Sequence, residues 1–132
     1  MRKAFEELRV AMADAAVAQL SGNVEPYLEF WSQKPDIFIF GGLGGYERGW
    51  PVVADRLRWA ATRVHARLSS IETLTSTIEG TMAITAELQH MVRFVDGKGI
   101  ERTLRVTHGY RVEGGQWRIF YRHGDEYKPS GR

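Results

Sequence analysis

The sequence predicts an α+β fold in which helices cover one face of an antiparallel sheet. Two changes along the chain carry this prediction. Apolar residues recur with a helical period up to Leu68 and with a period of two from Ser70 onward. Glycine-rich turns separate the segments of the second half, as expected between antiparallel strands. A chain of 132 residues has the length of one domain, and we expect residues 127–132 to form a frayed tail.

The first half predicts three helices and one short strand. Residues 2–20 carry a helical apolar stripe that a Ser-Gly-Asn sequence ends, and Asn23 caps a second, short helix. Residues 37–40 form an apolar run typical of a buried strand. Pro51 suits the first turn of a third helix, whose apolar face continues to Leu68.

The second half predicts four strands joined by short turns. Their expected spans are 71–78, 81–95, 100–112 and 117–125. Even-numbered residues of the second and third of these strands are mostly apolar, so we place both even sets on the helix-facing side.

This choice of face fixes the predicted strand partners. If the even-numbered residues of both strands face the helices, the loop between the strands must contain an odd number of residues. This predicts a three-residue turn, Gly97-Lys98-Gly99. A two-residue turn at Gly114-Gly115 then joins the last two strands. The expected partners are Val112 with Trp117, Tyr110 with Ile119, His108 with Tyr121, and Val106 with His123.

The predicted register gathers polar groups on the face that packs against the helices. They are His90, His108, His123, Tyr110, Tyr121 and Asp125. A buried imidazole or phenol needs hydrogen-bond partners, so two interpretations stay open: a self-satisfied core network, or a polar-lined pocket between sheet and helices. A metal site is disfavoured, because a strand separates His90 from His123 and no acidic ligand motif accompanies them.

The glycine-rich stretch "GGLGGYERGW", residues 41–50, resembles a phosphate-binding loop only in composition. It has neither the Gly-Lys-Ser/Thr ending of a P-loop nor the G-x-G-x-x-G spacing. Its predicted role is conformational: the glycines turn the chain sharply and bring Tyr46 and Trp50 near a cavity mouth.

Composition narrows the class of protein. There are 18 basic and 16 acidic residues, with no basic cluster interleaved with aromatics, so we expect no nucleic-acid partner. The absence of cysteine excludes disulfides and thiolate chemistry and fits a reducing compartment. No apolar run is long enough for a membrane span or typical of a signal peptide, so we expect a cytoplasmic protein with no membrane partner.

Two stretches, "YLEFWSQKPDIFIFGGLGGYERGW" and "LRVTHGYRVEGGQWRIFYRHGDEY", resemble the SnoaL-like, ketosteroid-isomerase-like proteins that share the nuclear transport factor 2 fold, also called cystatin-like. The resemblance covers roughly residues 4–126 and implies one SnoaL-like domain over 1–132. It also implies a cone: a curved antiparallel sheet, an α+β barrel wrapped around helices and a cavity. A homodimer formed through the outer face of the sheet is a further implication.

The family's best-known chemistry does not transfer directly. Ketosteroid isomerases move a proton with a carboxylate just after the first short strand. Phe40 and Gly41 occupy that position here and neither can move a proton, which disfavours steroid-type isomerisation.

Other pocket groups are candidates for catalysis. His108 or His123 would transfer a proton, Tyr110 or Tyr121 would donate to an oxyanion, and Asp125 would orient His123. The residues expected to bind a ligand are Trp31, Phe40, Trp50, His90 and Tyr121.

We therefore expect a pocket protein that binds a small, largely apolar molecule and contains no metal or cofactor. If it is an enzyme, it is a cofactor-independent isomerase, cyclase or dehydratase. The alternative is a non-catalytic ligand-binding or dimeric scaffold module.

Overall fold

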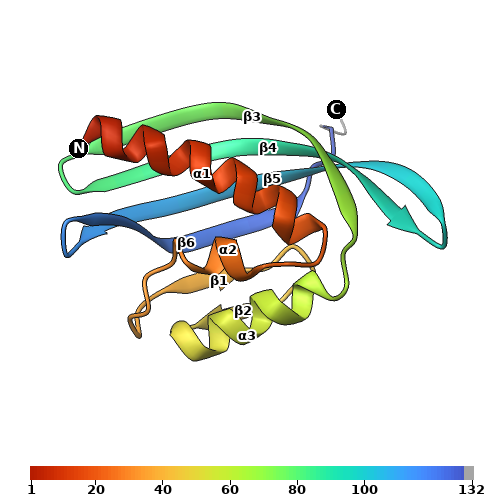
Figure 1. Ribbon diagram of the computed structural model, residues 1–132, viewed down its shortest axis with the longest axis horizontal. Coiled ribbons are helices and arrows are strands. Elements are labelled where there is room, and N and C mark those ends of the chain that lie inside the picture. Colours follow the sequence, from red (N-terminus) through yellow and green to blue (C-terminus); the bar gives the residue numbers. More distant parts are fainter. Residues whose placement is uncertain (130–132) are drawn as a thin grey trace.

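The computed structural model describes residues 1–129 and contains one curved sheet with helices on its concave side (Figure 1). The helices are α1 (Arg2–Leu20), α2 (Glu25–Leu28) and α3 (Trp50–Ala61). The strands are β1 (Phe38–Phe40), β2 (Tyr46–Arg48), β3 (Ala66–Glu79), β4 (Met82–Val95), β5 (Lys98–Glu113) and β6 (Gln116–Glu126). The predicted α+β class is confirmed. The end of the predicted tail, residues 130–132, lies outside the described residues.

The strand order is β2-β1-β6-β5-β4-β3, and the sheet stays open at β2 and β3. Neighbouring strands are antiparallel except β1 and β6, which run parallel. The four long strands curve around α1, which crosses the concave face in Figure 1.

Helix α1 packs through the stripe expected from the sequence. Its buried residues are Phe5, Met12, Ala15, Ala16 and Leu20. Phe5 is 1% exposed and contacts Tyr110 and Trp117 edge-on, at 4.8 and 5.1 Å between ring centroids. Truncating a buried phenylalanine to alanine costs about 3–5 kcal/mol, so this end of α1 is firmly held on the sheet.

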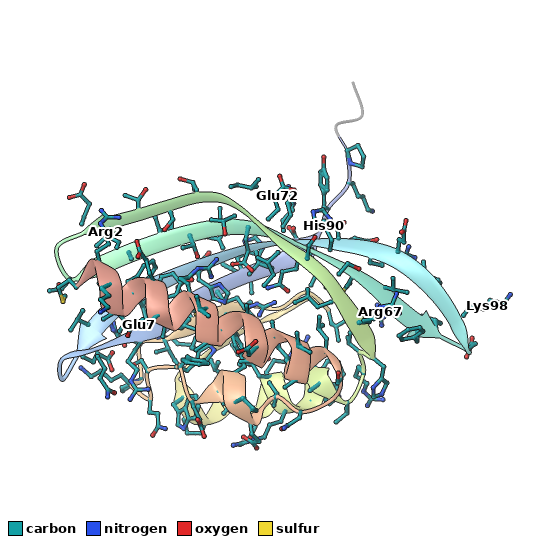
Figure 2. All side chains as sticks on the ribbon, turned by 45° about the horizontal axis from the view of Figure 1, so that its top comes forward. Arg2, Glu7, Arg67, Glu72, His90 and Lys98 are labelled. Atoms are coloured by element: carbon teal, nitrogen blue, oxygen red, sulfur yellow. The ribbon has the colours of Figure 1, made fainter. Side chains whose placement is uncertain are left out.

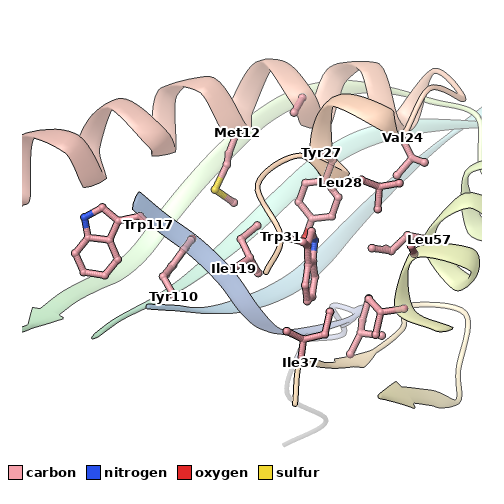
Figure 3. Close-up of a cluster of buried hydrophobic side chains, with 14 of the residues drawn as sticks. Met12, Val24, Tyr27, Leu28, Trp31, Ile37, Leu57, Tyr110, Trp117 and Ile119 are labelled. Carbon is pink, nitrogen blue, oxygen red and sulfur yellow. The ribbon is translucent and has the colours of Figure 1, made fainter. Parts of the chain in front are cut away.

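The main core lies between α1, the segment around α2, and β5–β6. Figure 3 shows Trp31, Ile37 and Leu57 converging there with Ile119 of β6. Trp31 forms an isolated parallel bridge with Ile119, so the chain after α2 adds to the sheet beside β6. This contact closes the bottom of the concave face.

The glycine-rich stretch contributes to a hairpin, formed by β1 and β2, that was not predicted from the sequence. Residues 41–45 connect β1 to β2, with Gly44 and Gly45 at φ +99° and +71°. These backbone angles favour glycine, which agrees with the predicted conformational role. Pro51 lies in the first turn of α3 as expected. The helix ends at Ala61 and β3 begins at Ala66, so part of the predicted helix belongs to the strand.

The predicted register between β4 and β5 is wrong by three residues, because the turn starts earlier and is one residue shorter than predicted. Val95 pairs with Lys98, so the turn has two residues, Asp96 and Gly97, at φ 52° and 76°. Asp-Gly is a favoured two-residue hairpin sequence because both positions need positive φ. An even loop pairs odd with even residues, which puts the odd residues of β4 on the concave face. They are Ala83, Thr85, Glu87, Gln89 and Met91.

A β-bulge changes the second predicted register. Val112–Trp117 and Tyr110–Ile119 pair as expected, but beyond them Gly109 pairs with Tyr121. Phe120 is the extra residue, and a one-residue insertion moves all later side chains to the opposite face. His108 therefore pairs with Arg122 instead of Tyr121, and Val106 pairs with Gly124 instead of His123.

Single cysteines in this cysteine-free chain test the corrected register. Ile84→Cys should react quickly with a thiol reagent in dilute native protein, because Ile84 is 49% exposed. Thr85→Cys should react at least about tenfold more slowly, because Thr85 is 0% exposed and its thiol needs local opening. Equal rates in denaturant provide the control. Faster reaction at position 85 would restore the register predicted from sequence.

Candidate functional site

A cavity of about 260 Å³ lies between α1 and the middle of the sheet. Its lining residues are Arg9, Val10, Met12, Ala13, Ala16, Gln19, Tyr27, Ile71, Thr73, Glu87, Gln89, His108 and Arg122. Buried and half-buried polar groups from α1, α2, β4, β5 and β6 meet there, and we call Arg9, Tyr27, Glu87, His108 and Arg122 the polar centre.

His108 on β5 is the buried histidine of the polar centre. It is 1% exposed, and its Nε2 lies 2.7 Å from the Tyr27 hydroxyl. Arg122 Nη1 donates to the same hydroxyl at 3.2 Å. Arginine only donates, so the Tyr27 hydroxyl accepts from Arg122, and His108 Nε2 is the one acceptor within reach of its own proton among the described residues. We therefore assign the Tyr27 O–H as donor to Nε2, which puts the proton of neutral His108 on Nδ1.

The His108 Nδ1 has no partner among residues 1–129, although it is fully buried. Burial, followed by the charges of Arg122 and Arg9, holds the pKa of His108 well below its ordinary 6.5. The imidazole is thus neutral near pH 7 and has an unused N–H donor. Unused buried donors are rare in folded proteins, which marks this ring for a ligand or water.

Glu87 on β4 is the buried carboxylate of the centre and is 2% exposed. Its Oε1 lies 2.8 Å from Arg9 Nη2, and its Oε2 accepts a 2.9 Å hydrogen bond from Gln89 Nε2. The Oε1 accepts no well-aligned hydrogen bond from the described residues. A carboxylate oxygen that has a free lone pair and lies beside a cavity can accept a proton from a bound molecule.

Tyr110 lies beneath the cavity and is engaged by the protein itself. Its hydroxyl is 2.6 Å from Thr85 Oγ1 and accepts a 3.0 Å hydrogen bond from Arg9 Nη1. Burial raises the pKa of Tyr110 to about 12. Tyr110 thus lies on the concave face as predicted, but its hydroxyl already has two partners, so it positions Arg9.

A second cavity of about 160 Å³ lies beside α3, and we call it the α3 chamber. Its lining residues are Gln19, Leu20, Ile39, Gly41, Gly42, Leu43, Arg56, Leu57, Ala60, Ala61, Val64, Gln89, Met91, Arg93, Arg102, Leu104, Arg122 and Glu126. Gln19, Gln89 and Arg122 line both cavities, so the polar centre adjoins an apolar space.

His90 lies on the outer face, contrary to the prediction. The corrected β4 register turns it away from the helices, where its Nδ1 is 3.0 Å from Thr103 Oγ1. Its Nε2 lies 3.2 Å from Glu72 Oε1, and Figure 2 shows these two side chains together. His90 therefore contacts neither cavity.

The bulge at Phe120 likewise turns Tyr121, His123 and Asp125 outward, which corrects a second part of the predicted site. Asp125 accepts two hydrogen bonds from Arg105, at 2.7 and 2.8 Å, and these lower the pKa of its carboxyl. His123 Nε2 lies 3.5 Å from Asp125, so the expected pair exists, but on the wrong side of the sheet for the cavity.

The predicted aromatic ligand contacts also lie elsewhere. Trp31 is 1% exposed within the core, and Trp50 packs against the same core. Phe40 alternates outward from β1, with its ring 5.1 Å from that of His123, while Ile39 faces the α3 chamber. None of the three predicted aromatic residues lines either cavity.

Residues 1–129 contain neither a cluster of metal ligands nor a helix suited to crossing a membrane. No group of three His, Cys, Asp or Glu side chains is placed to hold a metal ion. Within the same range, no helix combines the length and apolar character that a membrane crossing requires.

The fold and sequence match known proteins. Residues 8–124 match the SnoaL-like domain family. The chain belongs to this family. Among solved structures, a nuclear transport factor 2-like protein with a cystatin-like fold from Novosphingobium aromaticivorans is 19% identical, with a TM-score of 0.70 over 98% of this chain and 85% of that one. No curated protein matches the sequence significantly.

Two other structural neighbours have more specific names. A candidate calcium/calmodulin-dependent protein kinase type II association domain from Thiobacillus denitrificans has a TM-score of 0.74 at 16% identity, covering 93% of this chain and 94% of that one. A candidate dehydratase of the nuclear transport factor 2-like family from Streptomyces avermitilis has a TM-score of 0.72 at 11% identity, covering 97% and 99%. At these identities the likeness shows the fold.

The depressed pKa of His108 predicts how stability depends on pH. The unfolded state takes up a proton near pH 6.5 while the folded imidazole stays neutral, so the free energy of unfolding falls as pH drops below about 6.5. The slope from this group reaches about 1.4 kcal/mol per pH unit. We expect urea unfolding between pH 8 and 5 to show a smaller acid loss in His108→Asn than in wild type.

His65→Asn is the matched control for that measurement, since His65 is exposed after the end of α3. It should keep the wild-type slope. An unchanged slope in His108→Asn would show that His108 titrates normally in the folded protein.

Proposed function

We propose that this SnoaL-like protein binds a small, largely apolar carbonyl compound in the cavity under α1 and transfers a proton on it. The observation that carries the proposal is the buried, unpartnered Nδ1–H of His108 in the lining of that cavity. A ligand carbonyl oxygen is the acceptor that this N–H lacks, and burial makes such a hydrogen bond strong.

The polar centre supports an isomerase or dehydratase type of chemistry. Glu87 would take a proton from the carbon next to the carbonyl, and the electron pair would move to the carbonyl oxygen. The Nδ1–H of His108 would stabilise the developing oxyanion, with Tyr27 holding the ring by its 2.7 Å hydrogen bond. Glu87 would then return the proton to another carbon, or would give it to a hydroxyl group on the neighbouring carbon, which leaves as water as the carbon–carbon double bond forms.

Glu87 and His108 are close enough in the sheet to act on one ligand, with Glu87 as proton acceptor and His108 as hydrogen-bond donor. Thr85 is the strand partner of His108, and Glu87 lies two residues further along β4 on the same face. The two side chains are thus diagonal neighbours, an arrangement within reach of one small ligand. The proposed proton acceptor is thus the carboxylate of Glu87 rather than a histidine, and His108 is the hydrogen-bond donor.

A second proposal concerns assembly. The outer face of β4 exposes Met82, Ile84 and Phe94, at 50%, 49% and 46%. Met82 and Ile84 lie together at one end of this face and Phe94 lies at the other end. Exposed apolar side chains that cluster on a sheet face are typical of an interaction surface. The similarity to an association domain supports self-association, and we propose a homodimer through this face.

Proton transfer can be tested by following solvent deuterium exchange into small ketones by NMR. His108→Asn and Glu87→Gln should each lower the exchange rate by about 100-fold or more, because each removes one partner of the acid–base pair. His123→Asn is the matched control on the outer face and should retain full activity. Ligand-induced thermal stabilisation, measured in parallel, separates binding from turnover. Full exchange in both polar-centre variants would reject the catalytic roles.

Sedimentation at micromolar concentration tests the dimer. Wild type should sediment at twice the 15.0 kDa chain mass, and Ile84→Glu should sediment as a monomer because it buries a charge in the interface. Val52→Glu is the control, since Val52 is 48% exposed on α3, away from this face. A monomeric wild type would contradict the proposal.

A further inference from the structure

Arg122 of β6 is a buried cation that lines both cavities and has no acid to balance it. The residue is 8% exposed, and the one hydrogen bond of its guanidinium to residues 1–129 is the donation to Tyr27. None of the ion pairs in this part of the chain includes it. A guanidinium does not lose its proton in proteins, so the charge is permanent.

The other buried charges of the polar centre compensate each other. Arg9 and Glu87 form a pair at 2.8 Å, and neither contributes a net charge to the cavity. His108 stays neutral because of its burial and the two nearby arginines, as its lowered pKa indicates. The centre therefore has one unbalanced positive charge, an arrangement that costs stability unless an anion is bound.

The chain leaves room beside the donor groups of Arg122. Gly124 lies two residues further along β6, and a Cβ at this position would lie 3.3 Å from Arg122 Nη2 and 3.4 Å from Nε. These two nitrogens donate no hydrogen bond to the described residues, whereas Nη1 is used by Tyr27. Adjacent guanidinium N–H groups match the two oxygens of a carboxylate in a bidentate pair.

The α3 chamber, which is largely apolar, lies next to the Arg122 guanidinium. The α3 chamber has Leu20, Leu57, Met91 and Leu104 on its walls. Of the four arginines in its lining, Arg122 is buried, Arg56 and Arg93 are half-buried, and Arg102 is exposed and paired with Glu126. A ligand with an apolar body and one terminal anionic group would place the anionic group at Arg122 and the apolar body in the α3 chamber.

We propose that Arg122 selects ligands that carry a carboxylate, which it binds through Nε and Nη2 while the apolar body of the ligand lies in the α3 chamber. This inference rests on the proposed ligand-binding function and names its substrate class. The Tyr27 hydroxyl contacts both Arg122 and His108, so the carboxylate site adjoins the proposed carbonyl site. An apolar carboxylic acid with a carbonyl group nearby satisfies both.

Calorimetric titration with octanoate and its neutral isostere octanamide tests the proposal. Wild type should bind octanoate about tenfold or more tightly than octanamide, because only the acid forms a charge-assisted bidentate contact. Arg122→Gln should bind the two compounds equally. Gly124→Ala should weaken octanoate more than octanamide, since the added methyl group crowds Nε and Nη2. Arg58→Gln, an exposed arginine of α3 outside both cavities, should behave as wild type.

The outcomes separate this inference from the proposed function. Equal binding of octanoate and octanamide by wild type would overturn carboxylate selection and leave the pocket intact. Binding of neither compound would overturn both. Inorganic phosphate that binds as tightly as octanoate would show a general anion site and would also overturn the proposed class. The unfolding midpoint of ligand-free Arg122→Gln provides an independent check: it should equal or exceed that of wild type, because a buried unbalanced charge is removed. A clear fall would mean that the charge is already balanced within the protein.

Discussion

The contacts of Arg9 join α1 to the sheet and hold the cavity open beneath it. One guanidinium from the helix reaches Glu87 of β4, Tyr110 of β5 and, at 3.5 Å, Thr73 of β3. Such a buried pair adds little net stability over an apolar packing of the same volume, but breaking it by removing one partner costs roughly 3–5 kcal/mol. The pair thus fixes how the helix sits over the strands. Phe5 secures the near end of α1, and the cavity forms along the helix beyond it.

The two faces of the sheet use similar residues in different electrostatic settings. On the concave face, His108 loses its ordinary pKa because water is excluded and arginines lie nearby. On the outer face, Arg105 and Asp125 pair in contact with solvent, where water screens an ion pair and its net contribution to stability is small. Burial rather than residue type therefore decides which polar groups have functional potential. The same criterion distinguishes Arg122 from the exposed arginines.

Much of the fold was predictable because the sequence patterns that indicate its helices, strands and turns are local. The stripe of α1, the strand segments and the turn at Gly114-Gly115 each follow from a few neighbouring residues. Of the candidate site, the sequence placed His108 on the correct face but missed Glu87 and Arg122. Glu87 was missed because the more apolar, even-numbered side chains of β4 face outward, so the alternation indicated the wrong face. The Asp-Gly sequence at the β4–β5 turn was the available signal, since it favours an even loop.

The sequence by itself determined the class of fold, the family and the order of the elements apart from β2, because periodicity and turn chemistry act over short distances. Which side chains face the cavity was decided by the tertiary structure. The bulge at Phe120 has no strong local signature, yet it exchanges His123 for Arg122 on the concave face. A side-chain period of two makes a single inserted residue sufficient to reverse a strand. The chemistry of the pocket depends on that one-residue shift, which the strands adopt only when packed together.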